Sequence, residues 1–239
     1  MNWIIIVAGG NGSRMGQNQN KVFLPINGKE IIAHALEIFE NSKTIDHILI
    51  TAKQKEIDQI SSIIVKYGYK KIKKIITVDS KERQKNTWEA IKWLHQNTDS
   101  SDIVGVHNAV NPLVSTQEIE AVFTEAKKHG AALLAMPAKD TVKVANKDLF
   151  VDHTPNREFL FYAQTPQVAV LSILYEAFTK AQKDNYWGTD DTGLIERVNK
   201  KVKLVHCSAN NIKITYPIDL VAAQQMILQR DINHTKNNE

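Results

Sequence analysis

A continuously apolar run near the start of the chain leads directly into a loop rich in glycine. Residues 4–7 read Ile-Ile-Ile-Val, and β-branched residues without polar alternation are typical of a strand that is buried on both faces. Residues 8–16 read Ala-Gly-Gly-Asn-Gly-Ser-Arg-Met-Gly, so little side-chain bulk covers the backbone there. A doubly buried strand implies a parallel sheet with helices on both faces, because parallel strands need crossover connections.

Strand-like and helix-like segments alternate along the rest of the chain. The pattern weakens between residues 139 and 160, where a Thr-Pro-Asn-Arg turn indicates a β-hairpin arm. We therefore predict an α/β fold, a Rossmann-like and mostly parallel sheet in one domain of residues 1–239, with an arm at about residues 139–160. Strands are expected at 47–51, 75–78, 103–107, 131–136 and 202–205, and helices at 83–94, 172–181 and 190–198, with further helices around Ile32 and Ile57 and after Ser115 and Pro217.

The composition excludes several classes of protein. Of the 239 residues, 43% are hydrophobic and 23% are charged, which argues against disorder and coiled coil. The single cysteine, Cys207, excludes a disulfide framework and a cysteine-based zinc or iron–sulfur site. The apolar run at residues 3–8 is far too short to cross a bilayer and lacks signal-peptide flanks. We expect a soluble, cytoplasmic protein without a membrane partner.

The charge balance is mildly positive. Thirty Lys and Arg residues against 26 Asp and Glu give a net charge of +4, which suits anionic small molecules. The lysines at residues 70–74 have no arginine or aromatic–glycine pattern beside them. We interpret this stretch as a solvated strand edge and expect no nucleic-acid partner.

The glycine-rich loop is a candidate anion site. Backbone N–H groups in a loop of small residues can approach a phosphate closely, although the spacing here matches neither the dinucleotide fingerprint nor a Walker A loop. Arg14 lies inside the loop and Lys21 lies just after it. Cations fixed there would stabilise the negative charge that a triphosphate gains when its α-phosphorus is attacked. The alternative is a glycine-rich turn with two solvated basic residues.

Four later segments narrow the interpretation of this loop. They are Lys-Asp-Thr-Val-Lys at residues 139–143, Gln-Thr-Pro-Gln at 164–167, Thr-Asp-Asp at 189–191, and Asn-Ile-Lys-Ile-Thr at 211–215 followed by Pro-Ile-Asp-Leu. In this order, over essentially the whole chain, they resemble the 2-C-methyl-D-erythritol 4-phosphate cytidylyltransferases and the related ribitol-5-phosphate cytidylyltransferases. The loop alone also resembles the guanylyltransferases of molybdenum-cofactor synthesis, but the later segments favour the cytidylyl branch.

The resemblance implies the transfer of CMP from CTP to a polyol phosphate with release of pyrophosphate. The implied acceptor is 2-C-methyl-D-erythritol 4-phosphate, in isoprenoid precursor synthesis, with ribitol 5-phosphate or another pentitol phosphate as the alternative. Mg²⁺ is the implied cofactor, and a homodimer that interlocks its arms is the implied assembly. Elementary chemistry agrees, because a phosphate monoester is already a nucleophile near pH 7, so that positioning and charge neutralisation can supply the rate.

The resemblance also assigns roles to individual residues. Position 86 carries Asn where the family tends to have a serine near the nucleotide, and Arg157 on the arm would grip the acceptor phosphate of the neighbouring subunit. The implied catalytic residues are Arg14, Lys21 and Lys213; the implied nucleotide-binding residues are Ala8, Gly9, Gly10, Gly12 and Asn86; and the implied acceptor-binding residues are Arg157, Thr165 and Thr189.

Two positions after the fourth expected strand depart from the family pattern. The family usually has His-Asp-Ala-x-Arg-Pro, whereas residues 107–112 read His-Asn-Ala-Val-Asn-Pro, so Asn108 and Asn111 remove one negative and one positive charge. Asn108 would replace an aspartate that helps to hold Mg²⁺. Since Mg²⁺ often takes only one or two carboxylates besides substrate phosphates, we expect a metal site weakened by about 10- to 100-fold. The hypothesis is an active but metal-weakened or differently selective cytidylyltransferase, and the alternative is a paralogue that binds a nucleotide without turnover.

Two further features are open to a structural explanation. The eight histidines show no metal-ligand spacing, and we expect His107, at the end of a strand, to be structural. Asp190 either caps a helix or contacts substrate.

Overall fold

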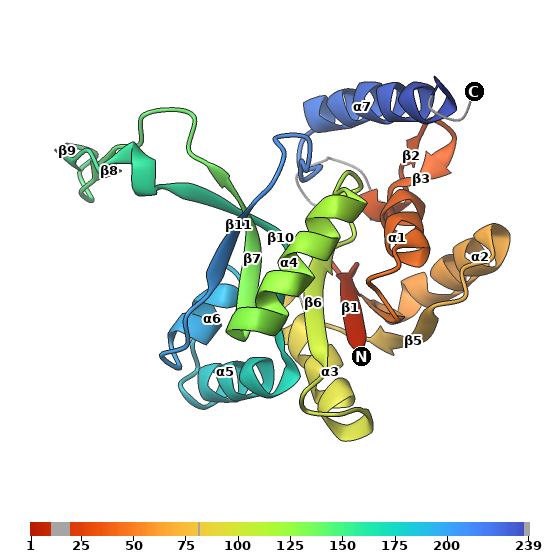
Figure 1. The fold of residues 1–239 in the computed structure, drawn as a ribbon, viewed down its shortest axis with the longest axis horizontal. Coiled ribbons are helices and arrows are strands. Elements are labelled where there is room, and N and C mark those ends of the chain that lie inside the picture. Colours follow the sequence, from red (N-terminus) through yellow and green to blue (C-terminus); the bar gives the residue numbers. More distant parts are fainter. Residues whose placement is uncertain (11–19, 81, 237–239) are drawn as a thin grey trace.

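The computed structural model describes the backbone of residues 1–10, 20–80 and 82–236, and side chains up to residue 230 (Figure 1). One sheet has the order β11-β7-β10-β6-β1-β4-β5. All neighbouring strands pair in parallel except β10, which is antiparallel to both β6 and β7. The strands are β1 (Asn2–Val7), β4 (His47–Ala52), β5 (Ile72–Thr77), β6 (Ile103–Asn108), β7 (Ala131–Pro137), β10 (Phe161–Val170) and β11 (Lys203–His206).

Helices cover both faces of this sheet, as Figure 1 shows. They are α1 (Ile31–Asn41), α2 (Ile57–Tyr67), α3 (Arg83–Asn97), α4 (Thr116–His129), α5 (Leu171–Lys183), α6 (Thr192–Glu196) and α7 (Pro217–Lys236). Ile4 and Ile6 of β1 pack with α1, α2, α4 and α7, whereas Trp3 and Ile5 pack with α3, α5 and α6. Successive side chains of a strand point to opposite faces, which explains why the run must be apolar throughout. The predicted fold class is confirmed.

Most of the predicted elements are present within a few residues of their expected bounds. Ser115 caps α4 as expected: its hydroxyl accepts from the Glu118 N–H, and the Glu118 carboxylate accepts from the Ser115 N–H. Two predicted bounds are wrong. β5 begins at Ile72 rather than residue 75, and α6 begins at Thr192 rather than residue 190, because the Asp190 side chain accepts from the Gly193 N–H instead of joining the helix.

The central strand β10 is absent from the sequence prediction. Its first half contains Gln164, Thr165 and Pro166, and a proline argues against a central strand because it has no N–H to donate. The pairing with β7 shifts its register between Ala163 and Gln167, and this irregularity accommodates Pro166. The break also places polar side chains of β10 next to the end of β6, where Gln167 pairs with Val106.

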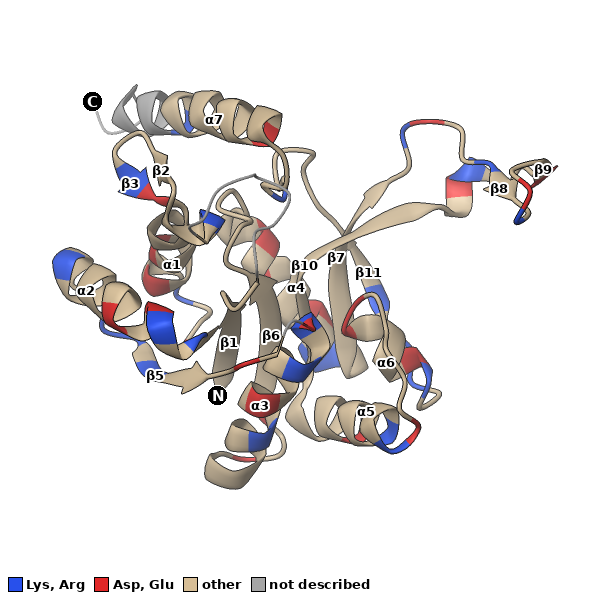
Figure 2. Cartoon of the chain, turned by 180° about the vertical axis from the view of Figure 1, so that it is seen from behind, with Lys and Arg blue, Asp and Glu red and all other residues tan. Residues whose placement is uncertain are grey.

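The predicted arm projects away from the rest of the molecule (Figure 1). A small hairpin, β8 (Val144–Ala145) and β9 (Val151–His153), is followed by a short 3₁₀ turn at Arg157–Phe159. Viewed from behind, both basic and acidic residues lie near β8 (Figure 2). Large apolar side chains on the arm are exposed, Leu149 to 87% and Phe150 to 72%. Within the described ranges, no helix has the length and apolar character that crossing a membrane requires.

Candidate active site

The candidate site begins where β1 ends. The Ala8 N–H donates to the Thr51 carbonyl at 2.9 Å, and the Ala8 carbonyl accepts from Asn20 Nδ2 at 3.0 Å, so the start of the loop is fixed between two segments. Gly9 lies against Asn86 of α3: a Cβ at Gly9 would come within 3.0 Å of Asn86 Nδ2 and 2.9 Å of Val78. Glycine is therefore needed here for close packing, and two predicted nucleotide-binding positions, Gly9 and Asn86, are adjacent.

The remainder of the loop is only partly described. Gly10 is exposed and has open space around its Cα. Gly12 and Arg14, both predicted site residues, lie outside the described residues.

Lys21, the second predicted cation of the loop, lies beside the segment that carries Lys213. Lys21 Nζ donates to the Ile214 carbonyl at 2.7 Å, and the Ile214 N–H donates to the Val110 carbonyl at 2.9 Å. The Lys21 ammonium is thus fixed next to the backbone that immediately follows Lys213. Lys21 and the Lys213 segment, nearly two hundred positions apart in sequence, therefore lie side by side near the ends of β1 and β6.

A polar cavity of about 340 Å³ is lined by Lys213. In an open α/β sheet, ligands bind at the carboxyl ends of parallel strands, which is where this cavity lies. Four predicted site residues line it: Asn108, Thr165, Thr189 and Lys213. Its other lining residues are Arg83, Asn111, Ala163, Gln164, Gln167 and Asp190.

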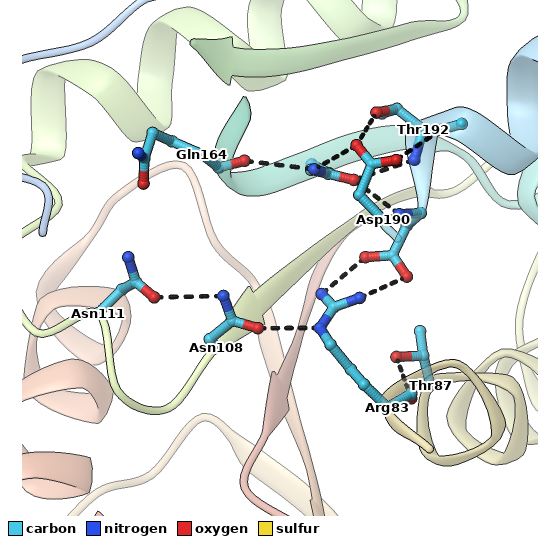
Figure 3. Close-up of polar contacts among 10 residues, drawn as sticks. Arg83, Thr87, Asn108, Asn111, Gln164, Asp190 and Thr192 are labelled. Atoms are coloured by element: carbon cyan, nitrogen blue, oxygen red, sulfur yellow. Dashed lines mark hydrogen bonds and ion pairs between the residues drawn. The ribbon is translucent and has the colours of Figure 1, made fainter. Parts of the chain in front are cut away.

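Gln167 joins the Thr-Pro-Gln and Thr-Asp-Asp segments into one unit. Its Oε1 accepts from the N–H groups of Asp191 and Thr192, both at 2.9 Å, and its Nε2 donates to Asp190 Oδ2 at 2.9 Å (Figure 3). The other oxygen of Asp190 accepts from the Gly193 N–H at 3.0 Å. This supports the helix-capping interpretation of Asp190, and the network holds Thr189 at the rim of the cavity.

Arg83 is a partly buried residue that organises this part of the site and was not among the predicted site residues. Its two terminal nitrogens donate to the two carboxylate oxygens of Asp191 at 2.8 and 2.9 Å, and its Nε donates to Asn108 Oδ1 at 2.9 Å (Figure 3). Burial opposes its charged form, but the Asp191 carboxylate outweighs burial and raises the pKa of Arg83. The Glu-Arg pair at the start of α3 is the sequence signal that could have identified it.

Position 108 does not fit a Mg²⁺ ligand in this chain. Asn108 Oδ1 accepts from the Arg83 guanidinium, and Asn108 Nδ2 donates to Asn111 Oδ1 at 3.2 Å. A divalent cation on that oxygen would stand next to a fixed positive charge. In the part of the chain that the structure describes, no group of three His, Cys, Asp or Glu residues could hold a metal ion. In the described structure Asn108 is a hydrogen-bonding residue, and the weak metal site expected there stays a prediction.

Three buried polar atoms around the site have no hydrogen-bond partner among the described residues. They are Asn86 Oδ1, Asn111 Nδ2 and Thr165 Oγ1. Asn86 and Asn111 are each only 1% exposed, and an unsatisfied buried group costs about 1–3 kcal/mol. Such a cost is offset when a ligand supplies the missing hydrogen bond.

His107 and Arg157 lie away from the cavity lining. His107 is fully buried, its Nε2 lies 2.9 Å from the Asn111 carbonyl, and its ring packs edge-on against Phe39, so its environment is structural. Burial lowers the pKa of His107 to about 4. Arg157 is exposed on the arm, where it donates to the Lys139 carbonyl at 3.0 Å. The predicted role of Arg157 therefore needs the site of another subunit.

The fold and the site together define a class of enzyme. A mostly parallel sheet, a glycine-rich loop after its first strand, and Lys21 held next to the segment whose Lys213 lines a polar cavity agree with a nucleotidyltransferase. The family model for 2-C-methyl-D-erythritol 4-phosphate cytidylyltransferase matches residues 3–230. The chain belongs to this family.

Individual relatives agree with this assignment. The chain is 39% identical to a 2-C-methyl-D-erythritol 4-phosphate cytidylyltransferase of Clostridioides difficile, covering 94% of this chain and 92% of that one. It is 35% identical to the enzyme of the same name from Alkaliphilus oremlandii, covering 95% of both chains. Its structure resembles 4-diphosphocytidyl-2C-methyl-D-erythritol synthase from Anaerococcus prevotii with a TM-score of 0.82 and 29% identity, covering 95% of this chain and 96% of that one.

Proposed function

We propose that this protein transfers CMP from CTP to 2-C-methyl-D-erythritol 4-phosphate, a step of isoprenoid precursor synthesis. A phosphate oxygen of the acceptor attacks the α-phosphorus of CTP, the bond from that phosphorus to the bridging oxygen breaks, and pyrophosphate leaves. The observation that carries the proposal is the convergence of Lys21 and the Lys213 segment beside a cavity lined by Thr165 and Thr189. Relatives at 35–39% identity that are named for this activity support it.

Side-chain cations would carry most of the rate enhancement. The two substrates bring several negative charges within bonding distance, and more negative charge collects on the oxygens around the α-phosphorus in the transition state. We assign Lys21 and Lys213 to the stabilisation of that charge. Arg14 and Gly12 would complete the triphosphate site from the loop, on the strength of the family resemblance.

The nucleotide would lie between the start of the loop and α3. Ala8, Gly9 and Gly10 offer a backbone that a ligand can approach closely, and Asn86 Oδ1 offers a buried acceptor next to Gly9. The exocyclic amine of cytosine is a donor, whereas uracil has a carbonyl oxygen at that place. An unsatisfied acceptor there supports selection of CTP over UTP.

The acceptor would lie in the cavity, with its hydroxyls near Thr165 and Thr189. Its phosphate would be gripped by Arg157 of the partner subunit, in a homodimer joined through the arms. Two observations support this: Arg157 is remote from the cavity lining of its own chain, and large apolar side chains of the arm are exposed. Arginine suits bidentate binding of a phosphate.

The family is generally dependent on a divalent cation, and we propose that Mg²⁺ is the ion. Because position 108 does not fit a metal ligand, we assign the ion to the CTP phosphates and treat it as part of the nucleotide substrate. Mg²⁺ commonly binds through substrate phosphates and water in this way.

Pyrophosphate release tests the proposed function directly. It is measured for CTP, UTP, GTP and ATP, each with 2-C-methyl-D-erythritol 4-phosphate, ribitol 5-phosphate or no acceptor, in Mg²⁺. We expect turnover with CTP and 2-C-methyl-D-erythritol 4-phosphate only. Turnover with ribitol 5-phosphate instead would show that the proposed acceptor is wrong, and a preference for GTP would show that the proposed nucleotide is wrong. CTP binding without turnover in any combination would contradict the enzyme assignment.

A further inference from the structure

The guanidinium of Arg83 connects three parts of the active site. Arg83 is the first residue of α3, the helix that carries Asn86 one turn later. Its ion-pair partner Asp191 lies two residues after Thr189, on the acceptor side of the cavity, and its third partner Asn108 is the last residue of β6. The cluster therefore spans the nucleotide side, the acceptor side and the end of the sheet.

Among the described residues, Asp191 is the carboxylate that hydrogen-bonds to Arg83, and the nearby Asp190 carboxylate also favours the charged form of Arg83. The Arg83 guanidinium faces the Asp191 carboxylate in a bidentate pair, and Asn108 adds a neutral acceptor on Nε. A carboxylate at position 108 would give the guanidinium a second anionic hydrogen-bond partner and would add a negative charge to the wall of a cavity that must admit phosphates.

The hydrogen bonds of Asn108 also require a neutral amide, because this side chain both accepts and donates. Asn108 accepts from Arg83 Nε through Oδ1 and donates to Asn111 Oδ1 through Nδ2. A carboxylate at position 108 could accept from Arg83 but has no hydrogen to donate to Asn111. The same amide thus completes the Arg83 contacts and supplies the donor for Asn111 Oδ1, on a residue that is 1% exposed.

From this geometry we propose that Arg83 is the positioning residue that fixes the acceptor-side loop against the nucleotide-side helix. Asn108 and Asn111 form a matched neutral pair that leaves Asp191 as the carboxylate bound to the Arg83 guanidinium. The proposal rests on the proposed function for the identity of the two sides. A lysine at position 83 would keep the charge but lose the fork that reaches both oxygens of Asp191 and the oxygen of Asn108. The acceptor-side loop would then lose its fixed distance from α3.

Steady-state kinetics of Arg83→Lys separate positioning from simple support of the fold. We expect the KM for the acceptor to rise by about 10-fold while the dissociation constant of CTP changes by less than about 2-fold, because the acceptor-side loop moves and the nucleotide site does not. If Arg83→Lys lowers the melting temperature but leaves the ratio of the acceptor KM to the CTP dissociation constant unchanged, Arg83 has only a structural role and the proposal is overturned.

A double-mutant cycle tests the matched pair. Asn108→Asp and Asn111→Arg are each expected to lower kcat/KM for the acceptor by about 10- to 100-fold, whereas the double variant returns to within about 3-fold of the natural protein, because the added charges offset each other. Gln96→Glu, the same amide-to-carboxylate change at the exposed far end of α3, is the matched control. An Asn108→Asp variant with unchanged kinetics, or a double variant whose loss equals the product of the single losses, would overturn the pairing.

Urea unfolding of the same four proteins needs no turnover. We expect the double variant to unfold at a higher urea concentration than the sum of the single shifts predicts, since the pair is in contact. If the natural protein releases no pyrophosphate from CTP, the proposed function fails while this cycle still decides the pairing. Additive midpoint shifts would then reject it.

Discussion

The cavity at the end of the sheet and the arm differ in which side chains are buried: polar ones are buried around the cavity, and apolar ones are exposed on the arm. Around the cavity, polar residues such as Gln167 and Asp191 are buried and hydrogen-bonded within the chain. On the arm, apolar residues such as Leu149 and Phe150 face outward. A buried polar network is stabilised by hydrogen bonds within the fold, whereas an exposed apolar hairpin gains stability only against another surface. The cavity is organised by one chain, whereas the exposed arm is the region that supports the proposed homodimer.

The largest effect is expected from a cation of the cavity. Lys213→Ala removes a positive charge that the resemblance implies for the reacting phosphates, and we expect kcat to fall by about 10²- to 10³-fold, as for the loss of one transition-state donor. Pyrophosphate release at saturating substrates measures it. Lys203→Ala, on the exposed face of β11, is the control and should retain full activity. If the kcat of Lys213→Ala stays within about 3-fold of that of the natural protein, Lys213 has no role in catalysis.

A smaller but qualitatively different effect is expected from the arm. Arg157→Ala should lower kcat/KM for the acceptor by about 10- to 100-fold, since it removes a charged contact to phosphate, and should leave the KM for CTP unchanged. Mixing this variant with Lys213→Ala tests whether the arm acts on the partner. Random exchange makes half of the dimers mixed, each with one complete site, so about one quarter of the natural activity should return. No recovery after demonstrated subunit exchange would place Arg157 in its own site or outside any site.

The buried histidine beside the cavity predicts how stability depends on pH. Burial lowers the pKa of His107 to about 4 in the folded chain, below its ordinary value near 6.5, so the unfolded chain binds the proton more readily. This contribution is fully present above about pH 6.5 and is lost as the pH falls toward 4, reaching about 2 kcal/mol of lost stability at pH 5. Urea unfolding of the natural protein and of His107→Gln at pH 7.5 and 5 measures it. Equal pH dependence in the two proteins would contradict the assignment.

The smallest effect is expected at the tip of the arm. Phe150→Ser changes an exposed side chain, so the free energy of unfolding of the dilute chain should change by less than about 0.5 kcal/mol, whereas Phe178→Ala in the core should cost about 3–5 kcal/mol. The same Phe150→Ser change should weaken self-association, measured by sedimentation against concentration. Unchanged self-association would show that the exposed arm residues do not form the interface.

Much of the fold could be predicted from local patterns. The β-branched run of β1, the helical spacing of α1 and the capping residue Ser115 each act within a few positions, and each prediction is confirmed. β10 could not be predicted in the same way, because its polar first half and Pro166 are tolerated only through a register shift against β7. Its place in the sheet depends on strands about thirty to sixty residues earlier in the chain.

The site residues show the same difference between what local sequence predicts and what tertiary contacts decide. Motifs identified Thr165, Thr189 and Lys213, and the structure brings all three to one cavity. The contact of Asn108 could not be predicted, because the sequence has no means of showing that Arg83, at the start of a different element, donates to its oxygen.

The sequence by itself determined the class of the sheet, the position of the glycine-rich loop and the supply of basic residues, since side-chain periodicity and loop composition are local properties. Only the tertiary structure decided which of those residues meet. Hydrogen bonds such as those that join Arg83, Asn108 and Asp191 depend on contacts across three separate elements, and no spacing along the chain encodes such a meeting point.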